Sequence, residues 1–156
     1  KTIITIIIVA VTTYAELFIN SDSTLLYKHV NYMVNTEKPR NYKNEDVLDS
    51  VAAYIKSEFK RYGYTEVKEQ KFEAKGKNYK NIIAVVGPEN TQTIVIGAHY
   101  DVCWDMPGAD DNASGVAGLL ECARIIYYNK EKLKIYLWNY EFKCNFVKYT
   151  LFGVCN

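Results

Sequence analysis

The amino-acid sequence predicts a single α/β domain built on a mixed, largely parallel central sheet. Its 156 residues, 49% of them hydrophobic, are enough for one globular domain with a hydrophobic core and too few for two ordinary domains. Two segments in the first half carry apolar residues at helical spacing, and the second half reads in the order strand, loop, helix, strand. That order is typical of a crossover connection, which joins parallel strands.

The first half of the chain is predicted to contain two amphipathic helices. The first starts from Ser23 as its N-cap and repeats apolar residues at helical spacing over residues 23–34. We assign no functional role to His29 within it, because a lone histidine on a helix is most often a packed or solvent-edge residue. After a loop at residues 36–43, the second helix covers residues 44–62, where Gly63 is placed to end it.

A β-hairpin is predicted to follow these helices. Residues 65–74 alternate polar and apolar positions, as an exposed strand does. The sequence Lys-Gly-Lys-Asn at residues 75–78 is a turn signal, and residues 80–86 make the return strand.

The crossover connection is predicted in the second half. A short apolar strand at residues 93–98 delivers His99 at its carboxyl end, a helix covers residues 113–128, and a strand at residues 134–138 completes the unit. In sheets of this kind a functional site lies at the carboxyl ends of the parallel strands, so we expect it near His99.

The amino terminus has the layout of a secretory signal peptide. One basic residue precedes an apolar run at residues 3–11, and Thr-Tyr-Ala fits the small-residue pattern of a cleavage site, with the cut after Ala15. We therefore expect residues 1–15 to be a signal peptide and the protein to be secreted or extracytoplasmic. A β-strand is the alternative, since Ile, Val and Thr dominate the run. The run is too short to cross a bilayer, which needs about 20 apolar residues, and we expect no stable membrane span.

The charge balance argues against polyanionic partners. The chain has 19 basic and 18 acidic residues, for a net charge of +1. Nucleic acids and anionic membranes attract strongly basic surfaces, so we expect no nucleic-acid partner.

An unusual density of carboxylates follows His99. The stretch from there to Gly115 reads HYDVCWDMPGADDNASG. Residues two apart in a strand point to the same side, so Asp101 can accept a hydrogen bond from one imidazole nitrogen while the other faces a metal. Asp110 and Asp111 directly precede a helix, where an aspartate can cap the helix or bind a cation. Histidine and carboxylates without a thiolate suit zinc or a similar divalent ion. A His-x-Asp pair alone is common and usually has no function, and Asp-Asp-Asn-Ala-Ser-Gly alone also fits an ordinary turn and helix cap.

The segments GAHYD and PGADDNASGVAGLLECARII resemble those of the co-catalytic zinc aminopeptidases, the family of bacterial leucyl aminopeptidases, aminopeptidase Y and glutamate carboxypeptidase. The resemblance extends over about residues 25–140. It implies an incomplete three-layer zinc-peptidase fold, with residues 16–156 as a partial peptidase domain. It also implies zinc as cofactor, two ions per site in the family, and hydrolysis of amino-terminal bonds in peptide substrates.

Specific roles follow from the resemblance. His99 occupies the position of a zinc ligand, Asp101 that of the aspartate that orients it, and Asp111 that of the aspartate that bridges two zinc ions. Asp110 is then a neighbour of the site and not a ligand. In the family the zinc pair activates a water, and a glutamate serves as general base.

The next motif of the family, a Glu-Glu pair after the following strand, has no counterpart in the final stretch NYEFKCNFVKYTLFGVCN. If Glu141 is aligned with the general base, Phe142 replaces the zinc ligand; if the pair is set two residues later, Lys143 and Cys144 occupy both places. We therefore expect weak or no catalysis by this chain alone, and interpret it as a truncated or altered product of a secreted zinc aminopeptidase gene. The strands that would complete the sheet are also missing, which leaves an edge for a partner chain to cover.

Three functions remain open from the sequence. The first is a zinc metallopeptidase of the aminopeptidase kind that keeps part of its metal site. The second is a non-catalytic member of the same fold that acts as a binding or interaction protein, because a fold alone does not fix function. The third, glutaminyl cyclisation on a related single-zinc scaffold, would require a glutamate and a second histidine as further ligands, and no histidine follows His99 in the sequence.

Overall fold

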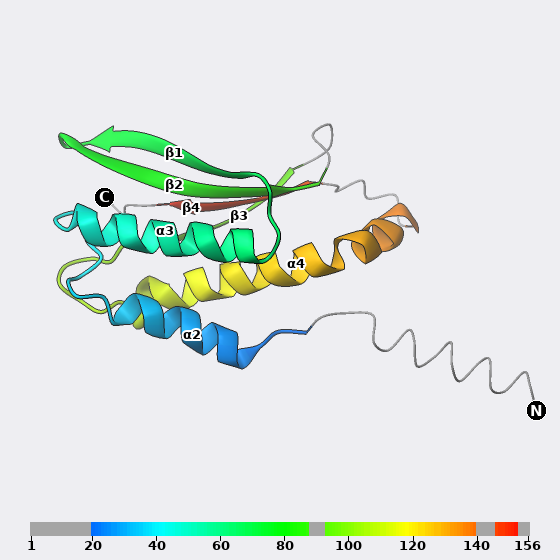
Figure 1. Cartoon of the computed structure of the whole chain (residues 1–156), viewed down its shortest axis with the longest axis horizontal. Coiled ribbons are helices and arrows are strands. Elements are labelled where there is room, and N and C mark those ends of the chain that lie inside the picture. The colour runs from blue at the N-terminus through cyan, green and yellow to red at the C-terminus, as the bar shows by residue number, and fades with distance from the viewer. Residues whose placement is uncertain (1–19, 88–92, 140–145, 153–156) are drawn as a thin grey trace, which may run out of the picture.

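Three helices lie on one face of a four-stranded sheet in the computed structural model, which describes residues 20–87, 93–139 and 146–152 (Figure 1). In chain order the elements are α2 (Ser23–Val34), α3 (Glu45–Arg61), β1 (Val67–Ala74), β2 (Lys77–Val86), β3 (Thr93–His99), the irregular turn η1 (Ala109–Ala113), α4 (Ser114–Asn139) and β4 (Phe146–Phe152). Helix α3 packs on β2, α4 packs on β3, and α2 packs against α4. The predicted α/β class is confirmed.

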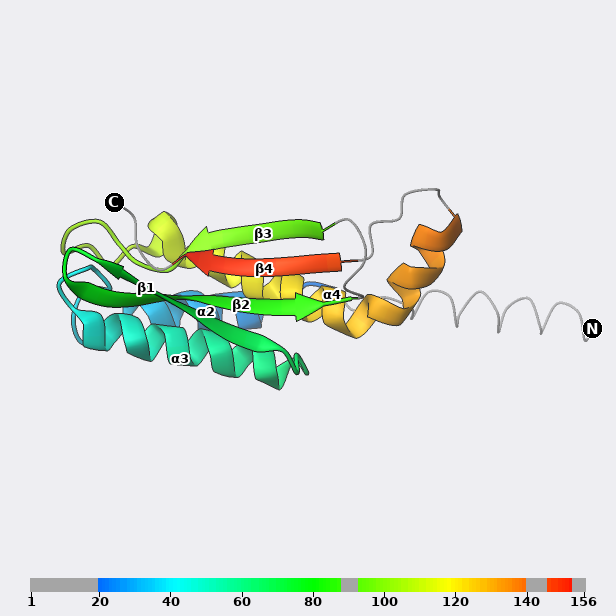
Figure 2. The same ribbon diagram turned by 90° about the horizontal axis from the view of Figure 1, so that it is seen from above.

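The sheet is mixed, and its strand order is β1-β2-β4-β3 (Figure 2). Strand β2 pairs antiparallel with both β1 and β4. Strands β3 and β4 are parallel neighbours, and α4 connects them. The predicted crossover is thus present, and it brings His99 to the carboxyl end of a parallel strand.

The second strand of the crossover lies later in the chain than the sequence predicts. Residues 134–138, predicted as a strand, belong to the last part of α4, and the strand beside β3 is β4. The stretch Asn-Lys-Glu-Lys-Leu-Lys at residues 129–134 consists mainly of straight-chain residues with high helix propensity and contains neither glycine nor proline. Nothing in it stops the helix, so the apolar pattern that follows continues in helical conformation.

The hairpin turn is shorter than predicted. Ala74 pairs with Lys77, so the turn consists of Lys75 and Gly76 alone. Their φ values are 52° and 73°, and a two-residue turn with two positive φ angles matches the right-handed twist of the adjoining strands.

Both amino-terminal helices are present where the sequence predicts them, with one correction at a cap. The N-cap of α2 is Asp22 and not Ser23, and its carboxylate accepts hydrogen bonds from two amides of the first turn. Gly63 follows the C-cap of α3 with φ 105°, and a Cβ there would lie 2.5 Å from the ring of Tyr127. Gly63 therefore both ends the helix and allows α4 to approach it.

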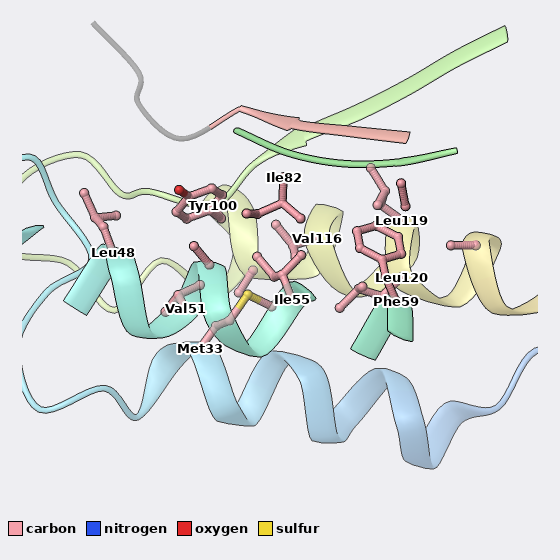
Figure 3. Packing of buried hydrophobic residues seen from close by; sticks show 14 of the residues in the cluster. Met33, Leu48, Val51, Ile55, Phe59, Ile82, Tyr100, Val116, Leu119 and Leu120 are labelled. Carbon is pink, nitrogen blue, oxygen red and sulfur yellow. The ribbon is translucent and has the colours of Figure 1, made fainter. Parts of the chain in front are cut away.

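The hydrophobic core fills the space between the sheet and the helices (Figure 3). Its main side chains come from all three helices, from β2 and from the residue after β3: Met33, Leu48, Val51, Ile55, Phe59, Ile82, Tyr100, Val116, Leu119 and Leu120. Tyr100 directly follows His99, so the candidate site is anchored in this core.

Two predictions lie outside the described residues: the signal peptide at residues 1–15 and the position of Glu141. Among the described residues, no helix combines the length and the apolar character that a membrane span requires.

Candidate metal centre

His99 is the last residue of β3, and the two residues that follow it, Tyr100 and Asp101, are buried. Tyr100 is 2% exposed, and its hydroxyl donates a hydrogen bond to the carbonyl of Lys80 on β2 (2.6 Å). This bond ties the end of β3 to the sheet. The imidazole of His99 itself keeps partial access to solvent, with 25% of its side chain exposed.

Asp101 holds one nitrogen of the imidazole. The Nδ1–H of His99 donates to Oδ1 of Asp101 over 3.1 Å, and the aspartate side chain is only 3% exposed. A carboxylate can only accept, so this contact places the proton on Nδ1 and leaves the lone pair of Nε2 free to bind a cation. The contact that the sequence predicts between Asp101 and the imidazole is present, and the role of Asp101 in orienting a zinc ligand stays a prediction.

Asp111 faces the other nitrogen. Its Oδ1 lies 3.0 Å from Nε2 of His99, and 70% of its side chain is exposed. Asp111 belongs to η1, where it and Asn112 have non-helical φ and ψ values and are joined by a cis peptide bond. The structure therefore brings together the three residues that the sequence singled out, His99, Asp101 and Asp111.

Asn112 was not singled out from the sequence, yet it also contacts the site. Its side-chain amide donates to the backbone carbonyl of His99 (3.4 Å). Gly115 allows this arrangement, because a Cβ at that position would lie 2.1 Å from Oδ1 of Asn112. The glycine of the Asn-Ala-Ser-Gly sequence thus makes room for a side chain that joins η1 to the end of β3.

Asp110 does not take part in the pairing of His99 with Asp111. Its side chain is exposed, and its backbone carbonyl accepts a hydrogen bond from the hydroxyl of Ser114, the first residue of α4 (2.9 Å). This placement agrees with the expectation that Asp110 is a neighbour of the site.

The donor atoms suit a divalent cation. With Nδ1 protonated, the lone pair of His99 Nε2 faces a carboxylate oxygen of Asp111 at 3.0 Å, and two acceptors at that distance are stable only with a proton or a cation between them. Ligand atoms about 2.1 Å from a zinc ion lie about 3 to 3.5 Å apart. Within the described residues, no group of three or more histidine, cysteine, aspartate or glutamate side chains is placed so that it could hold a metal ion, and the pair of His99 and Asp111 offers two donors.

Comparison with known proteins relates this segment to a peptidase family. The model of peptidase family M28 matches residues 81–142, which include β3, α4 and the connection between them at residues 100–113, called the metal loop below. The uncharacterized protein YfbL of Escherichia coli K12 is 43% identical over 123 residues, covering 74% of this chain and 38% of YfbL. Leucine aminopeptidase 1 of Sclerotinia sclerotiorum is 29% identical over 122 residues, covering 62% of this chain and 32% of that enzyme.

Solved structures show the same fold. A Zn-dependent exopeptidase from Parabacteroides distasonis superposes with a TM-score of 0.64 at 24% identity, over 88% of this chain and 50% of the exopeptidase. A glutaminyl cyclase of Bacteroides thetaiotaomicron superposes with a TM-score of 0.67 at 22% identity, over 86% of this chain and 47% of the cyclase. The fold is therefore common to hydrolytic and cyclising enzymes.

The chain spans only about a third of the curated relatives that it matches, 38% of YfbL and 32% of the aminopeptidase. The matched part nevertheless carries the histidine and aspartates of the metal loop and the strand, loop and helix that position them. The family model, the aminopeptidase relatives and the exopeptidase fold agree, and together they support a co-catalytic zinc aminopeptidase-like family for this chain.

Proposed function

We propose that this chain contributes part of the zinc site of a metallopeptidase that hydrolyses amino-terminal peptide bonds, and that by itself it is weakly active or inactive. The observation that carries the proposal is the pairing of His99 Nε2 with Asp111 Oδ1 at 3.0 Å, while the buried Asp101 holds Nδ1. His99 and Asp111 are the proposed zinc ligands, and Asp101 is the proposed orienting residue.

Each of these residues has a separate chemical task in the proposed site. A bound zinc ion supplies the activation of a water molecule and the polarisation of the peptide carbonyl. Asp101 keeps the imidazole in the tautomer that presents Nε2 as a ligand. Asp111 supplies negative charge on the exposed side, where a substrate can reach. Glu141, which lies outside the described residues, is the proposed general base.

The number of donors supports weak activity. Catalytic zinc sites have three protein ligands and an open position for water, whereas His99 and Asp111 supply two. Glu141 or Cys144, both outside the described residues, are the candidates for further donors in this chain. Without such a donor, the pair holds zinc weakly.

Metal content tests the proposal. The purified, folded chain is dialysed against a weak chelator and its zinc is measured by elemental analysis, alongside His99→Ala and Asp111→Ala. Asp110→Ala is the matched control, because it removes a neighbouring carboxylate of the same turn. We expect zinc in the wild type and in the control, and loss in the other two. Equal zinc in all four proteins would show that the loop is not the metal site.

Activity is the second measurement. Zinc-loaded protein is assayed with leucine p-nitroanilide as an aminopeptidase substrate and with an amino-terminal glutaminyl peptide as a cyclase substrate. We expect slow release of nitroaniline that His99→Ala abolishes. Cyclisation in place of hydrolysis would contradict the peptidase assignment and leave the metal assignment intact.

A non-catalytic binding function is the second candidate, and the presence of only two converging donors in the described residues favours it. A folded chain that holds no zinc would support this function. The edge of β3, where Val95 is 58% exposed, is where we propose that a partner chain adds its strand.

We also propose that the protein is secreted. Amino-terminal sequencing of exported protein tests this proposal, and a chain that begins at Glu16 is expected.

A further inference from the structure

Arg40 is a fully buried arginine in the connection between α2 and α3. It is 1% exposed, although it lies in a segment that the sequence predicts only as a loop. Burial lowers the pKa of Arg40 below its ordinary value, and the neighbouring Asp101 carboxylate opposes that shift. Arginine remains protonated in proteins, so the molecule holds a charged guanidinium in its interior. A buried charge is costly unless hydrogen bonds satisfy it.

The guanidinium binds the two ends of the metal loop at once. Its Nε donates to the carbonyl of Tyr100 (3.0 Å), Nη1 donates to that of Pro107 (2.8 Å), and Nη2 donates to that of Gly108 (3.0 Å). Nη1 also donates to the carbonyl of Met33 at the end of α2. One rigid, planar group therefore connects the chain just after β3 with the chain just before η1.

These carbonyls stand next to the proposed ligands in the sequence. Tyr100 lies between His99 and Asp101, and Gly108 lies three residues before Asp111. The planar guanidinium fixes the distance between these two carbonyls, and so limits how far the two ligands can move apart. Fork-shaped donors of this kind set geometry better than a flexible ammonium does.

Residues 40 and 41 also contact the middle of the metal loop. The amide of Val102 donates to the carbonyl of Arg40 (2.9 Å), and the side-chain amide of Asn41 donates to the carbonyl of Trp104 (2.7 Å). Gly108 has φ 62°, and a Cβ there would lie 2.1 Å from Val102 and 3.0 Å from Nη2 of Arg40. The packing therefore leaves no room for a side chain at position 108.

We propose that Arg40, together with Asn41, is the positioning element of the metal loop: its hydrogen bonds set the separation of His99 and Asp111. This inference rests on the proposed zinc site for its functional meaning. The geometric part does not depend on zinc, since it concerns the path of the loop in the metal-free chain.

The test compares Arg40→Lys with a core variant that weakens the fold elsewhere. Lysine keeps the charge but concentrates its donors at one point, so it cannot bridge the carbonyls of Tyr100 and Gly108. Phe59→Leu is the control, because Phe59 is buried near the opposite end of α3. Zinc affinity is measured by competition with a chromogenic chelator, and amide hydrogen exchange is measured on the metal-free proteins.

We expect Arg40→Lys to weaken zinc binding about 10-fold or more, the range seen when a group supporting a metal ligand is lost. The Phe59→Leu control is expected to bind as the wild type does. In the metal-free proteins, the amide of Val102 should exchange faster in Arg40→Lys than in the wild type or in Phe59→Leu. Equal zinc affinity in Arg40→Lys and wild type, or unchanged exchange at Val102, would overturn the proposal.

Two further results would also be informative: a wild type without zinc, and an Arg40→Lys variant that does not fold. If the wild type holds no zinc, the proposed function fails, and the exchange of Val102 still decides whether Arg40 fixes the loop. If Arg40→Lys does not fold, Asn41→Ala decides in its place, because it removes the contact with Trp104 without leaving a buried charge. A smaller loss of zinc affinity with faster exchange in the loop supports the proposal, and wild-type values in both measurements overturn it.

Discussion

Acid is expected to destabilise this protein through a histidine remote from the metal loop. His29 on α2 is 0% exposed, and its two ring nitrogens lie 2.7 Å from the hydroxyl of Tyr54 and 2.9 Å from that of Tyr62. A neutral imidazole has one donor and one acceptor nitrogen, so two hydroxyls satisfy it fully. Burial is the main reason why the pKa of His29 is lowered; the nearby Glu58 carboxylate opposes the shift and Arg61 adds to it.

The sign and size of the effect follow from this lowered pKa. In the unfolded chain His29 titrates near its ordinary value of 6.5. Below that pH the unfolded state binds a proton that the folded state does not, so the free energy of unfolding falls as the pH falls. The slope for one such group is at most about 1.4 kcal/mol per pH unit, and between pH 7 and pH 5.5 the loss is about 1 kcal/mol.

Urea unfolding followed by circular dichroism at pH 7, 6.5, 6 and 5.5 measures this loss. The comparison protein is His29→Gln, which keeps a donor and an acceptor but does not titrate. It retains His99, so any effect of that histidine cancels. We expect the stability advantage of the wild type over His29→Gln to shrink by about 1 kcal/mol across the range. A constant difference between the two proteins would refute the reasoning, as would a wild type that gains stability relative to the variant in acid.

Three other substitutions have outcomes that the structure specifies. Gly115→Ala places a Cβ 2.1 Å from the side chain of Asn112, so it should break the bond to the His99 carbonyl and weaken zinc binding about 10-fold in chelator competition. Gly118→Ala in the same helix meets nothing within 4 Å, and should raise the unfolding free energy by about 0.5 to 1 kcal/mol while leaving zinc affinity unchanged. Asp22→Ala removes the N-cap of α2 and should cost about 1 kcal/mol in thermal unfolding.

Elements with a complete local signal could be predicted from the sequence. Helix α3 has an apolar stripe, an acidic first turn and a glycine after its end, and these signals all favour the same conformation. The hairpin likewise has its turn residues between two strand-forming segments. Residues 134–138 show the converse case, because their apolar pattern fits both a strand and the continuation of a helix. The residues just before them have high helix propensity and favour the continuation of α4, but an interpretation of residues 134–138 alone does not include them.

The meeting of His99 with Asp101 and Asp111 could be predicted for a similar reason. His99 and Asp101 are two residues apart at a strand end, and Asp111 follows through one tight loop, so their meeting depends on short-range geometry. Asn112 could have been found by the same reasoning. It follows Asp111 directly, and Gly115 stands three residues after it, which is the spacing of neighbours on a helix.

Arg40 could not be found in this way, because its partners in the metal loop lie 60 to 68 residues further along the chain. Only the docking of α2 and α3 under the sheet brings it to the loop. The site therefore combines proposed ligands that a local motif encodes with a separation that the tertiary fold imposes. A fragment beginning at Thr93 would contain His99, Asp101 and Asp111, and would still lack the group that fixes their distance. Metal binding should then depend on the first two helices as strongly as on the motif itself.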